Sequence, residues 1–246
     1  MTKLATRCAQ LLLGVFSLLT LTGTAQAGDP PTSPLTVVEL FQSQGCSSCP
    51  PAEANLNALA SRPDILALSF GVTYWDDLGW KDTFAASAYT DRQYDYAHYN
   101  HRSGVYTPQV IIDGQKDLVG SDPGQLDKAI ASARLHGPVL SWGKGQLQVG
   151  AGEVKTPADV WLVRYDPRTL NVAIAAGENR GRTLPHRNVV RELVHLGVWN
   201  GSAQSFRLPA PALGGLSTAA LVQLPAGGEI LSASRAATAD VRTASR

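Results

Sequence analysis

Two cysteines separated by two serines are the side chains in this sequence best suited to chemistry. The motif reads Cys46-Ser47-Ser48-Cys49. Two thiols at this spacing can close a disulfide, and a thiolate is the nucleophile of thiol–disulfide exchange. The upstream cysteine of such a pair is normally the exposed attacker, so we assign attack to Cys46 and resolution of the mixed disulfide to Cys49. The motif therefore predicts a redox-active pair.

Two other interpretations of the cysteine pair stay open. A static disulfide across a loop of about four residues contributes roughly 2 kcal/mol, against roughly 3 kcal/mol for a loop of about fifteen residues, so the pair is a poor staple. Two thiolates also suit Cu(I) or zinc, and a histidine such as His98 or His101 has to complete that site. The sequence holds no second C-x-x-C motif, so a structural zinc site is disfavoured and no metal ligand is predicted.

The first residues have the pattern of a signal peptide. Lys3 and Arg7 supply a short positive region, and residues 11–21 form an apolar run. An A-x-A pattern that ends at Ala27 then predicts a cleavage site. The apolar run is about half of the roughly 20 residues that span a bilayer. We therefore expect residues 1–27 to be removed and no stable membrane anchor to remain.

Removal of this leader changes the cysteine count. Cys8 leaves with it, and the mature chain keeps only Cys46 and Cys49. Export delivers the pair to a compartment in which disulfides form. The formal net charge of the sequence is +1, which argues against nucleic acid or an anionic membrane bound through bulk charge. The expected partners are thiols and disulfides of proteins or small molecules, and no cofactor is expected.

The cysteine motif lies between a predicted strand and a predicted helix. Residues 35–41 are rich in β-branched and apolar side chains, residues 52–61 have apolar side chains at helical spacing, and residues 65–72 form a second apolar run. This order predicts two parallel strands joined by a right-handed crossover. The N-terminus of the helix favours a thiolate. Pro50 and Pro51 disfavour helical backbone at the residue before each of them, which weakens that support.

The remaining pattern predicts a boundary near Pro138. Before it, residues 74–88 indicate an irregular insertion, and after it, short β-type runs alternate with Gly and Pro turns. The predicted domains cover residues 35–137 and 138–235, followed by a flexible tail over residues 236–246. The first domain is expected to hold further helices over residues 91–101 and 124–135 and strands over residues 109–114 and 118–119. In the second we expect strands over residues 147–149, 158–165, 171–176, 188–199, 219–224 and 229–233.

The order of these elements resembles the thioredoxin superfamily. The resemblance rests on a strand, the C-x-x-C motif, a helix and a strand, and on Tyr106-Thr107-Pro108 before a later strand. It implies that a cis Thr107–Pro108 peptide faces the disulfide, that Pro108 shapes the active loop and that Thr107 contacts the substrate. With the β-type pattern after Pro138, it predicts an α/β fold in which a thioredoxin-like domain is followed by a mostly-β C-terminal subdomain.

A narrower resemblance is carried by the segments around these motifs. They are residues 38–41 and 46–51, Tyr74-Trp75-Asp76, residues 78–82, Tyr106-Thr107-Pro108-Gln109 and Gly177-Glu178-Asn179. Together they are similar to DUF1223, a family of exported bacterial proteins of unknown function. The resemblance favours the bacterial periplasm as the location, and it supplies no known reaction.

Two segments rich in polar and aromatic residues are further candidates for the site. Trp75 and Asp76 could bind substrate in a groove beside the disulfide, or they could pack within a loop in which the acid caps a turn. Glu178 and His186 could face the cysteines and bind a partner, or they could belong to a hairpin with solvated charges. Glu39 could relay a proton for the buried thiol or lie on a solvent-facing side of its strand.

These patterns predict an exported thiol–disulfide redox protein in which Cys46 attacks and Cys49 resolves. The mostly-β half would select or position the partner. A module that binds or handles copper through both thiolates is the alternative from another class. A third possibility is a non-enzymatic thioredoxin-like adaptor that keeps the scaffold for binding only.

Overall fold

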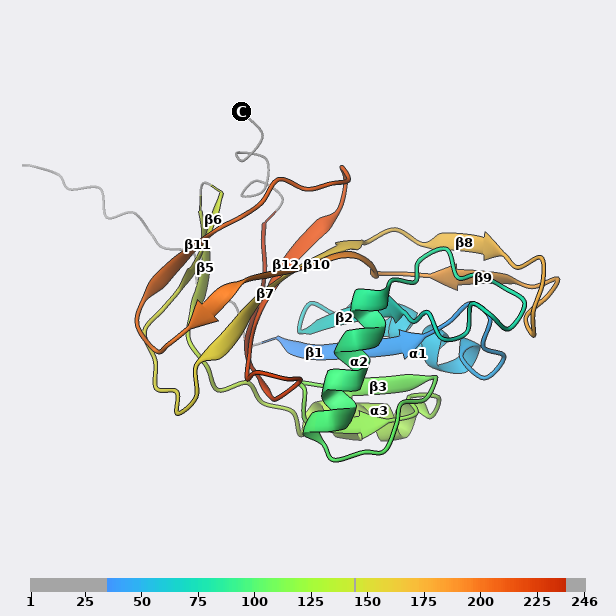
Figure 1. Cartoon of the computed structure of the whole chain (residues 1–246), viewed down its shortest axis with the longest axis horizontal. Coiled ribbons are helices and arrows are strands. Elements are labelled where there is room, and N and C mark those ends of the chain that lie inside the picture. The colour runs from blue at the N-terminus through green and yellow to red at the C-terminus, as the bar shows by residue number, and fades with distance from the viewer. Residues whose placement is uncertain (1–34, 144, 238–246) are drawn as a thin grey trace, which may run out of the picture. The chain divides into compact units, whose positions relative to one another are not determined.

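An eight-stranded mixed sheet forms the centre of the fold (Figure 1). The computed structural model describes residues 35–143 and 145–237, so the predicted leader and residues 238–246 of the predicted tail lie outside the described residues. Across the sheet the strands are β13 (Ile230–Arg235), β12 (Ser217–Gln223), β7 (Ala158–Asp166), β10 (Val189–Trp199), β2 (Ile65–Gly71), β1 (Thr36–Gln42), β3 (Gln109–Ile112) and β4 (Lys116–Leu118).

The strand–helix–strand unit around the cysteines is confirmed. Strands β1 and β2 are parallel, and α1 (Pro50–Leu59) connects them. Nearly every residue of these two strands is buried, because helices cover both faces of this part of the sheet. Strand β3 runs antiparallel to β1 on the side away from β2. The fold class is therefore mixed α/β.

Three helices pack on the two faces of this part of the sheet. From α2 (Ser87–Tyr99), Tyr89 and Tyr96 pack on one face with Phe41. On the other face α1 packs together with α3 (Pro123–Ala131). Helix α2 begins at Ser87, before the predicted start at Asp91, because packing of its aromatic residues extends it beyond the expected cap. Among the described residues, no helix is long and apolar enough to span a membrane.

The start of α1 differs from the sequence prediction. The helix begins at Pro50, two residues before the predicted start, and Cys49 is its N-cap with helical backbone angles (φ −74°, ψ −34°). Proline is tolerated in a first helical turn because the N–H groups there have no partner within the helix. The N–H of Glu53 donates to the carbonyl of Cys49 at 3.0 Å, so the first helical bond starts at the second cysteine.

The second half of the chain adds strands to the same central sheet. Strand β10 pairs in parallel with β2 through Val189 and Ser69, and antiparallel with β7 along its length. Strands from both sides of the predicted boundary thus share one sheet. Most of the predicted β runs are strands. Those that the sequence reasoning missed are β5 (Leu140–Gly143), β9 (Thr183–His186) and β11 (Gln204–Arg207).

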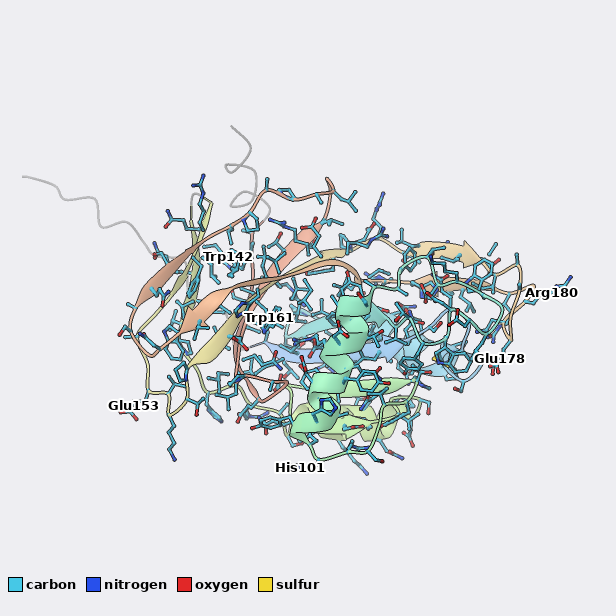
Figure 2. All side chains as sticks on the ribbon, in the orientation of Figure 1. His101, Trp142, Glu153, Trp161, Glu178 and Arg180 are labelled. Carbon is cyan, nitrogen blue, oxygen red and sulfur yellow. A yellow bond between two sulfur atoms is a disulfide. The ribbon has the colours of Figure 1, made fainter. Side chains whose placement is uncertain are left out.

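Two smaller sheets complete the described part of the chain. Strands β11, β6 (Gln146–Val149) and β5 form a three-stranded sheet, and its apolar side packs with Trp199 and strands β7 and β12 in a separate core. Strands β8 (Leu170–Ala173) and β9 form a two-stranded ribbon. The loop between β8 and β9 carries Glu178, as Figure 2 shows. This ribbon brings residues of the second half to the cysteine motif.

Candidate functional site

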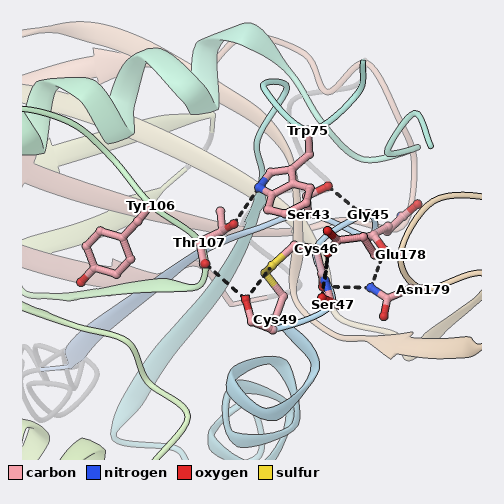
Figure 3. Close-up of a disulfide and its surroundings, with 12 residues drawn as sticks. Ser43, Gly45, Cys46, Ser47, Cys49, Trp75, Tyr106, Thr107, Glu178 and Asn179 are labelled. Carbon is pink, nitrogen blue, oxygen red and sulfur yellow. Dashed lines mark hydrogen bonds between the residues drawn. A yellow bond between two sulfur atoms is a disulfide. The ribbon is translucent and has the colours of Figure 1, made fainter. Parts of the chain in front are cut away.

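Cys46 and Cys49 form a disulfide where β1 passes into α1 (Figure 3). A tight turn brings the two residues together, because the N–H of Cys46 donates to the Ser43 carbonyl and the N–H of Cys49 donates to the Cys46 carbonyl. Their Cα atoms are 5.5 Å apart, within the usual range for a disulfide. The spacing of the motif and the start of the helix together produce this local geometry.

The expected exposure of Cys46 is wrong in this disulfide form. Cys46 is 0% exposed and Cys49 is 2% exposed, whereas the two serines between them are exposed. Segments distant in the sequence cover the sulfur atoms, which local sequence reasoning did not predict. Exposure therefore does not distinguish an attacking from a resolving cysteine.

One part of this cover is the pair Thr107 and Trp75. The Thr107–Pro108 peptide is cis, and Pro108 is buried. The indole Nε1 of Trp75 donates to Thr107 Oγ1 at 2.7 Å, and both side chains lie beside the disulfide in Figure 3. Ser48 Oγ donates to the Thr107 carbonyl at 3.5 Å and lies 3.3 Å from Cys46 Sγ. The structure thus brings Trp75, Thr107 and the disulfide together.

The segment that follows Trp75 holds the cysteine loop from outside. The N–H of Gln44 donates to the carboxylate of Asp82 at 2.7 Å, and Trp80 Nε1 donates to Gln44 Oε1 at 3.0 Å. Burial raises the pKa of Asp82, although hydrogen bonds from Gln44 and Phe84 oppose the shift. Asp76 accepts a hydrogen bond from the Asp82 N–H at 3.0 Å. Asp76 is thereby linked to the residue that holds Gln44.

The loop between β8 and β9 forms another part of the cover. Glu178 accepts hydrogen bonds from the N–H and the Oγ of Ser47, at 3.1 and 2.7 Å, and these bonds lower the pKa of its exposed carboxyl group. The buried Asn179 Nδ2 donates to the carbonyls of Gln44 and Cys46, each at 2.9 Å. Sequence reasoning missed the role of Asn179, although it follows Glu178 directly in the Gly177-Glu178-Asn179 motif.

The two covering segments meet at a pair of glycines. A Cβ atom on Gly79 would lie 3.6 Å from the Cα atom of Gly177. Both glycines have positive φ, 97° and 73°, a conformation that favours glycine over other residues. The close approach joins the segment after β2 to the β8–β9 loop above the disulfide.

His186 lies on a different side of the cysteine motif from Glu178. A cavity of about 230 Å³ separates α1 from β9 and is lined by Cys49, Glu53 and His186. His186 Nδ1 lies 3.1 Å from Glu53 Oε1, and both side chains are buried. Sequence reasoning missed Glu53, although its i+4 spacing from Cys49 places both residues on one side of α1. The other residues that line the cavity are Gln42, Ser43, Pro50, Ala54, Asn57, Arg182, Thr183, Leu184 and Pro185.

Glu39 does not lie on a solvent-facing side of its strand. Its carboxylate is 0% exposed and pairs with Arg92, whose Nε and Nη2 lie 2.8 and 3.2 Å from the two oxygens. The hydroxyl of Tyr96 also donates to this carboxylate, and Tyr96 in turn accepts from Gln223 at 3.0 Å. Glu39 is thus an anchor between β1 and α2.

The comparisons with known proteins agree with this architecture. A family model described as "Protein of unknown function (DUF1223)" matches residues 37–223, from β1 to the end of β12. This chain belongs to the DUF1223 family. The narrower resemblance, to DUF1223, is thereby confirmed. None of the curated proteins matches the chain.

Two solved structures are similar to this DUF1223 protein. A protein from Agrobacterium tumefaciens, whose X-ray crystal structure is known, has 30% sequence identity and a TM-score of 0.69, over 82% of this chain and 94% of its own. HBP35 of Porphyromonas gingivalis has 12% identity and a TM-score of 0.54, over 86% of this chain and 76% of its own. The second likeness concerns the fold alone.

Metal binding at the cysteines would need further ligands. Across residues 35–143 and 145–237, no group of three or more His, Cys, Asp or Glu side chains is arranged to hold a metal ion. His98 and His101 are exposed at the C-terminal end of α2, where Figure 2 shows His101.

Proposed function

We propose that this DUF1223 protein is an exported thiol–disulfide redox protein with a thioredoxin-like site. The observation that carries the proposal is the disulfide between Cys46 and Cys49 at the N-terminus of α1. The partial positive charge at a helix N-terminus stabilises a thiolate, which is the reactive form. A loop of so few residues adds little stability, so a role in exchange accounts for the pair better than a structural role.

In the reduced protein the Cys46 thiolate attacks one sulfur of a substrate disulfide. A bond forms between Cys46 and the substrate, and the other substrate sulfur leaves as a thiolate and takes up a proton. The Cys49 thiolate then attacks Cys46 Sγ and releases the second substrate thiol. Two electrons pass from the protein to the substrate, and the Cys46–Cys49 disulfide is restored. The same steps in reverse oxidise a substrate dithiol.

The surroundings of Cys46 support its role in the mixed disulfide. Ser48 Oγ lies 3.3 Å from Cys46 Sγ and can donate a hydrogen bond to a thiolate at that position. Trp75 and Thr107 offer an aromatic surface and a backbone carbonyl beside the disulfide for a bound thiol substrate. Because the cysteines are buried, exchange with a protein requires the contacts of Ser47 and Trp75 to open.

Serine substitutions test the two roles separately. Cys46→Ser abolishes exchange with a dithiol substrate, whereas Cys49→Ser accumulates a mixed disulfide between Cys46 and the substrate, which mass spectrometry identifies. Ser205→Ala, at an exposed serine of β11, is the control and keeps exchange. Unchanged turnover in the Cys46→Ser protein would overturn the proposal.

A further inference from the structure

Two buried ionisable side chains beside the motif lack hydrogen-bond partners. Glu53 is 4% exposed and His186 is 1% exposed. Within residues 35–143 and 145–237, Glu53 Oε2 and both ring nitrogens of His186 have no hydrogen-bond partner, and Glu53 Oε1 accepts from Ser69 Oγ at 3.5 Å. Their only close approach to each other is the 3.1 Å between Glu53 Oε1 and His186 Nδ1. The hydrogen-bonding groups of this buried pair are therefore incompletely satisfied.

Stability does not explain this pair. A buried polar atom without a partner lowers stability by about 1–3 kcal/mol, and replacing a buried ion pair by apolar side chains is often neutral or stabilising. An apolar residue at position 186 would pack against Phe84, whose ring lies 5.6 Å from the ring of His186. A titratable pair at such a position therefore points to a function.

Glu53, one member of the pair, follows Cys49 by one turn of α1. Glu53 donates its N–H to the Cys49 carbonyl at 3.0 Å, and both residues line the cavity between α1 and β9 together with His186. A cavity of about 230 Å³ is large enough for several water molecules. The other charged groups near the pair are Asp82, from the segment after β2, and Arg182, from the β8–β9 loop.

We infer that the Glu53–His186 pair exchanges the proton of the Cys49 thiol through this cavity. The inference rests on the proposed redox function. When an external thiol breaks the disulfide, Cys49 becomes a thiolate and the His186 imidazolium gives it a proton through cavity water. When Cys49 attacks the mixed disulfide, its proton returns to His186. Both side chains act on Cys49 without touching the substrate, so they are positioning residues.

The charge of His186 fits this role. Burial alone lowers the pKa of His186, but the close approach and charge of Glu53, together with the charge of Asp82, outweigh burial and raise it. The imidazolium form therefore persists to higher pH than in an ordinary histidine. The buried carboxylate of Glu39 is paired with Arg92 and accepts from Tyr96 on the side of α2.

Titration of the Cys49 thiol tests the inference directly. The background is the full chain with Cys8→Ser and Cys46→Ser, in which Cys49 is the only remaining cysteine. Thiolate absorbance in the ultraviolet then reports the pKa of Cys49. His186→Gln removes the positive charge of the pair and leaves Glu53 charged, so it raises this pKa by about one unit, whereas Glu53→Gln also lets His186 become neutral and changes the pKa by less. A packing defect at either residue does not follow the net charge of the pair in this way.

His195→Gln is the matched control. His195 is an exposed histidine that also pairs with a carboxylate, Asp159, at 2.9 Å, and its loss leaves the pKa of Cys49 unchanged. Equal shifts of the Cys49 pKa in the two variants, or no shift in His186→Gln, would overturn the inference. Failure of the wild-type protein to exchange thiols would overturn the proposed function instead, because the coupling of Cys49 to the pair is measured without turnover.

Discussion

Glu39 and Glu53 are buried carboxylates on opposite sides of the same sheet, and their partners differ. Glu39 makes two contacts with Arg92 and accepts from Tyr96, so its oxygens are satisfied. Glu53 approaches His186 through one oxygen and leaves the other without a partner. Arginine stays charged at every accessible pH, whereas histidine gains and loses a proton near neutrality. The first pair can only hold the fold together, and the second can also change its charge.

The largest expected effect is a difference in how much the two carboxylates contribute to the stability of the fold. Glu39→Gln leaves Arg92 buried without a charged partner and lowers the free energy of unfolding by about 3 kcal/mol. Glu53→Gln lowers it by about 1 kcal/mol or less, since this carboxylate is already incompletely paired and His186 can become neutral. Urea unfolding of the two variants and the wild-type protein measures both changes. Equal decreases in the free energy of unfolding would show that the two pairs contribute equally to stability.

A second prediction concerns the pH dependence of stability. The pKa of His186 is raised in the folded protein, so its charge stabilises the fold fully below its ordinary value of about 6.5. This contribution is lost as pH rises through the raised pKa. The difference in unfolding free energy between wild type and His186→Gln therefore decreases between about pH 6 and pH 8.

The Glu39–Arg92 pair supplies the control for this pH series. Because Arg92 does not titrate in that range, the difference between wild type and Glu39→Gln stays constant from about pH 6 to pH 8. Urea unfolding at a series of pH values measures both differences. A constant difference for His186→Gln would mean that its charge does not change in this window.

The smallest effect is expected at Glu178, a carboxylate that is exposed rather than buried. Glu178→Ala removes the hydrogen bonds that hold Ser47 over the disulfide, so reduction of the disulfide by a phosphine becomes faster by about two- to fivefold. Glu153→Ala, at another exposed acid, leaves the rate unchanged. A rate equal to that of wild type in the Glu178 variant would show that Ser47 does not limit access.

The sequence by itself determined the local frame of the site. The apolar runs on each side of the motif predicted β1, α1 and β2. Each prediction needed only the spacing of apolar side chains within one short segment of the sequence. Asp122, a residue type that favours the N-cap position, accepts from the N–H groups of Gly124 and Gln125 at the start of α3. The C-x-x-C spacing likewise predicted that Cys46 and Cys49 could join.

Only the tertiary structure decided what surrounds the disulfide. Three features of the site depend on contacts between residues far apart in the chain. They are the burial of Cys46, the hydrogen bonds of Asn179 and the pairing of Glu53 with His186. Such contacts depend on how β10 enters the sheet beside β2 and where the β8–β9 ribbon then lies. No local propensity encodes that placement, because the free energy that fixes it comes from burial of the whole core.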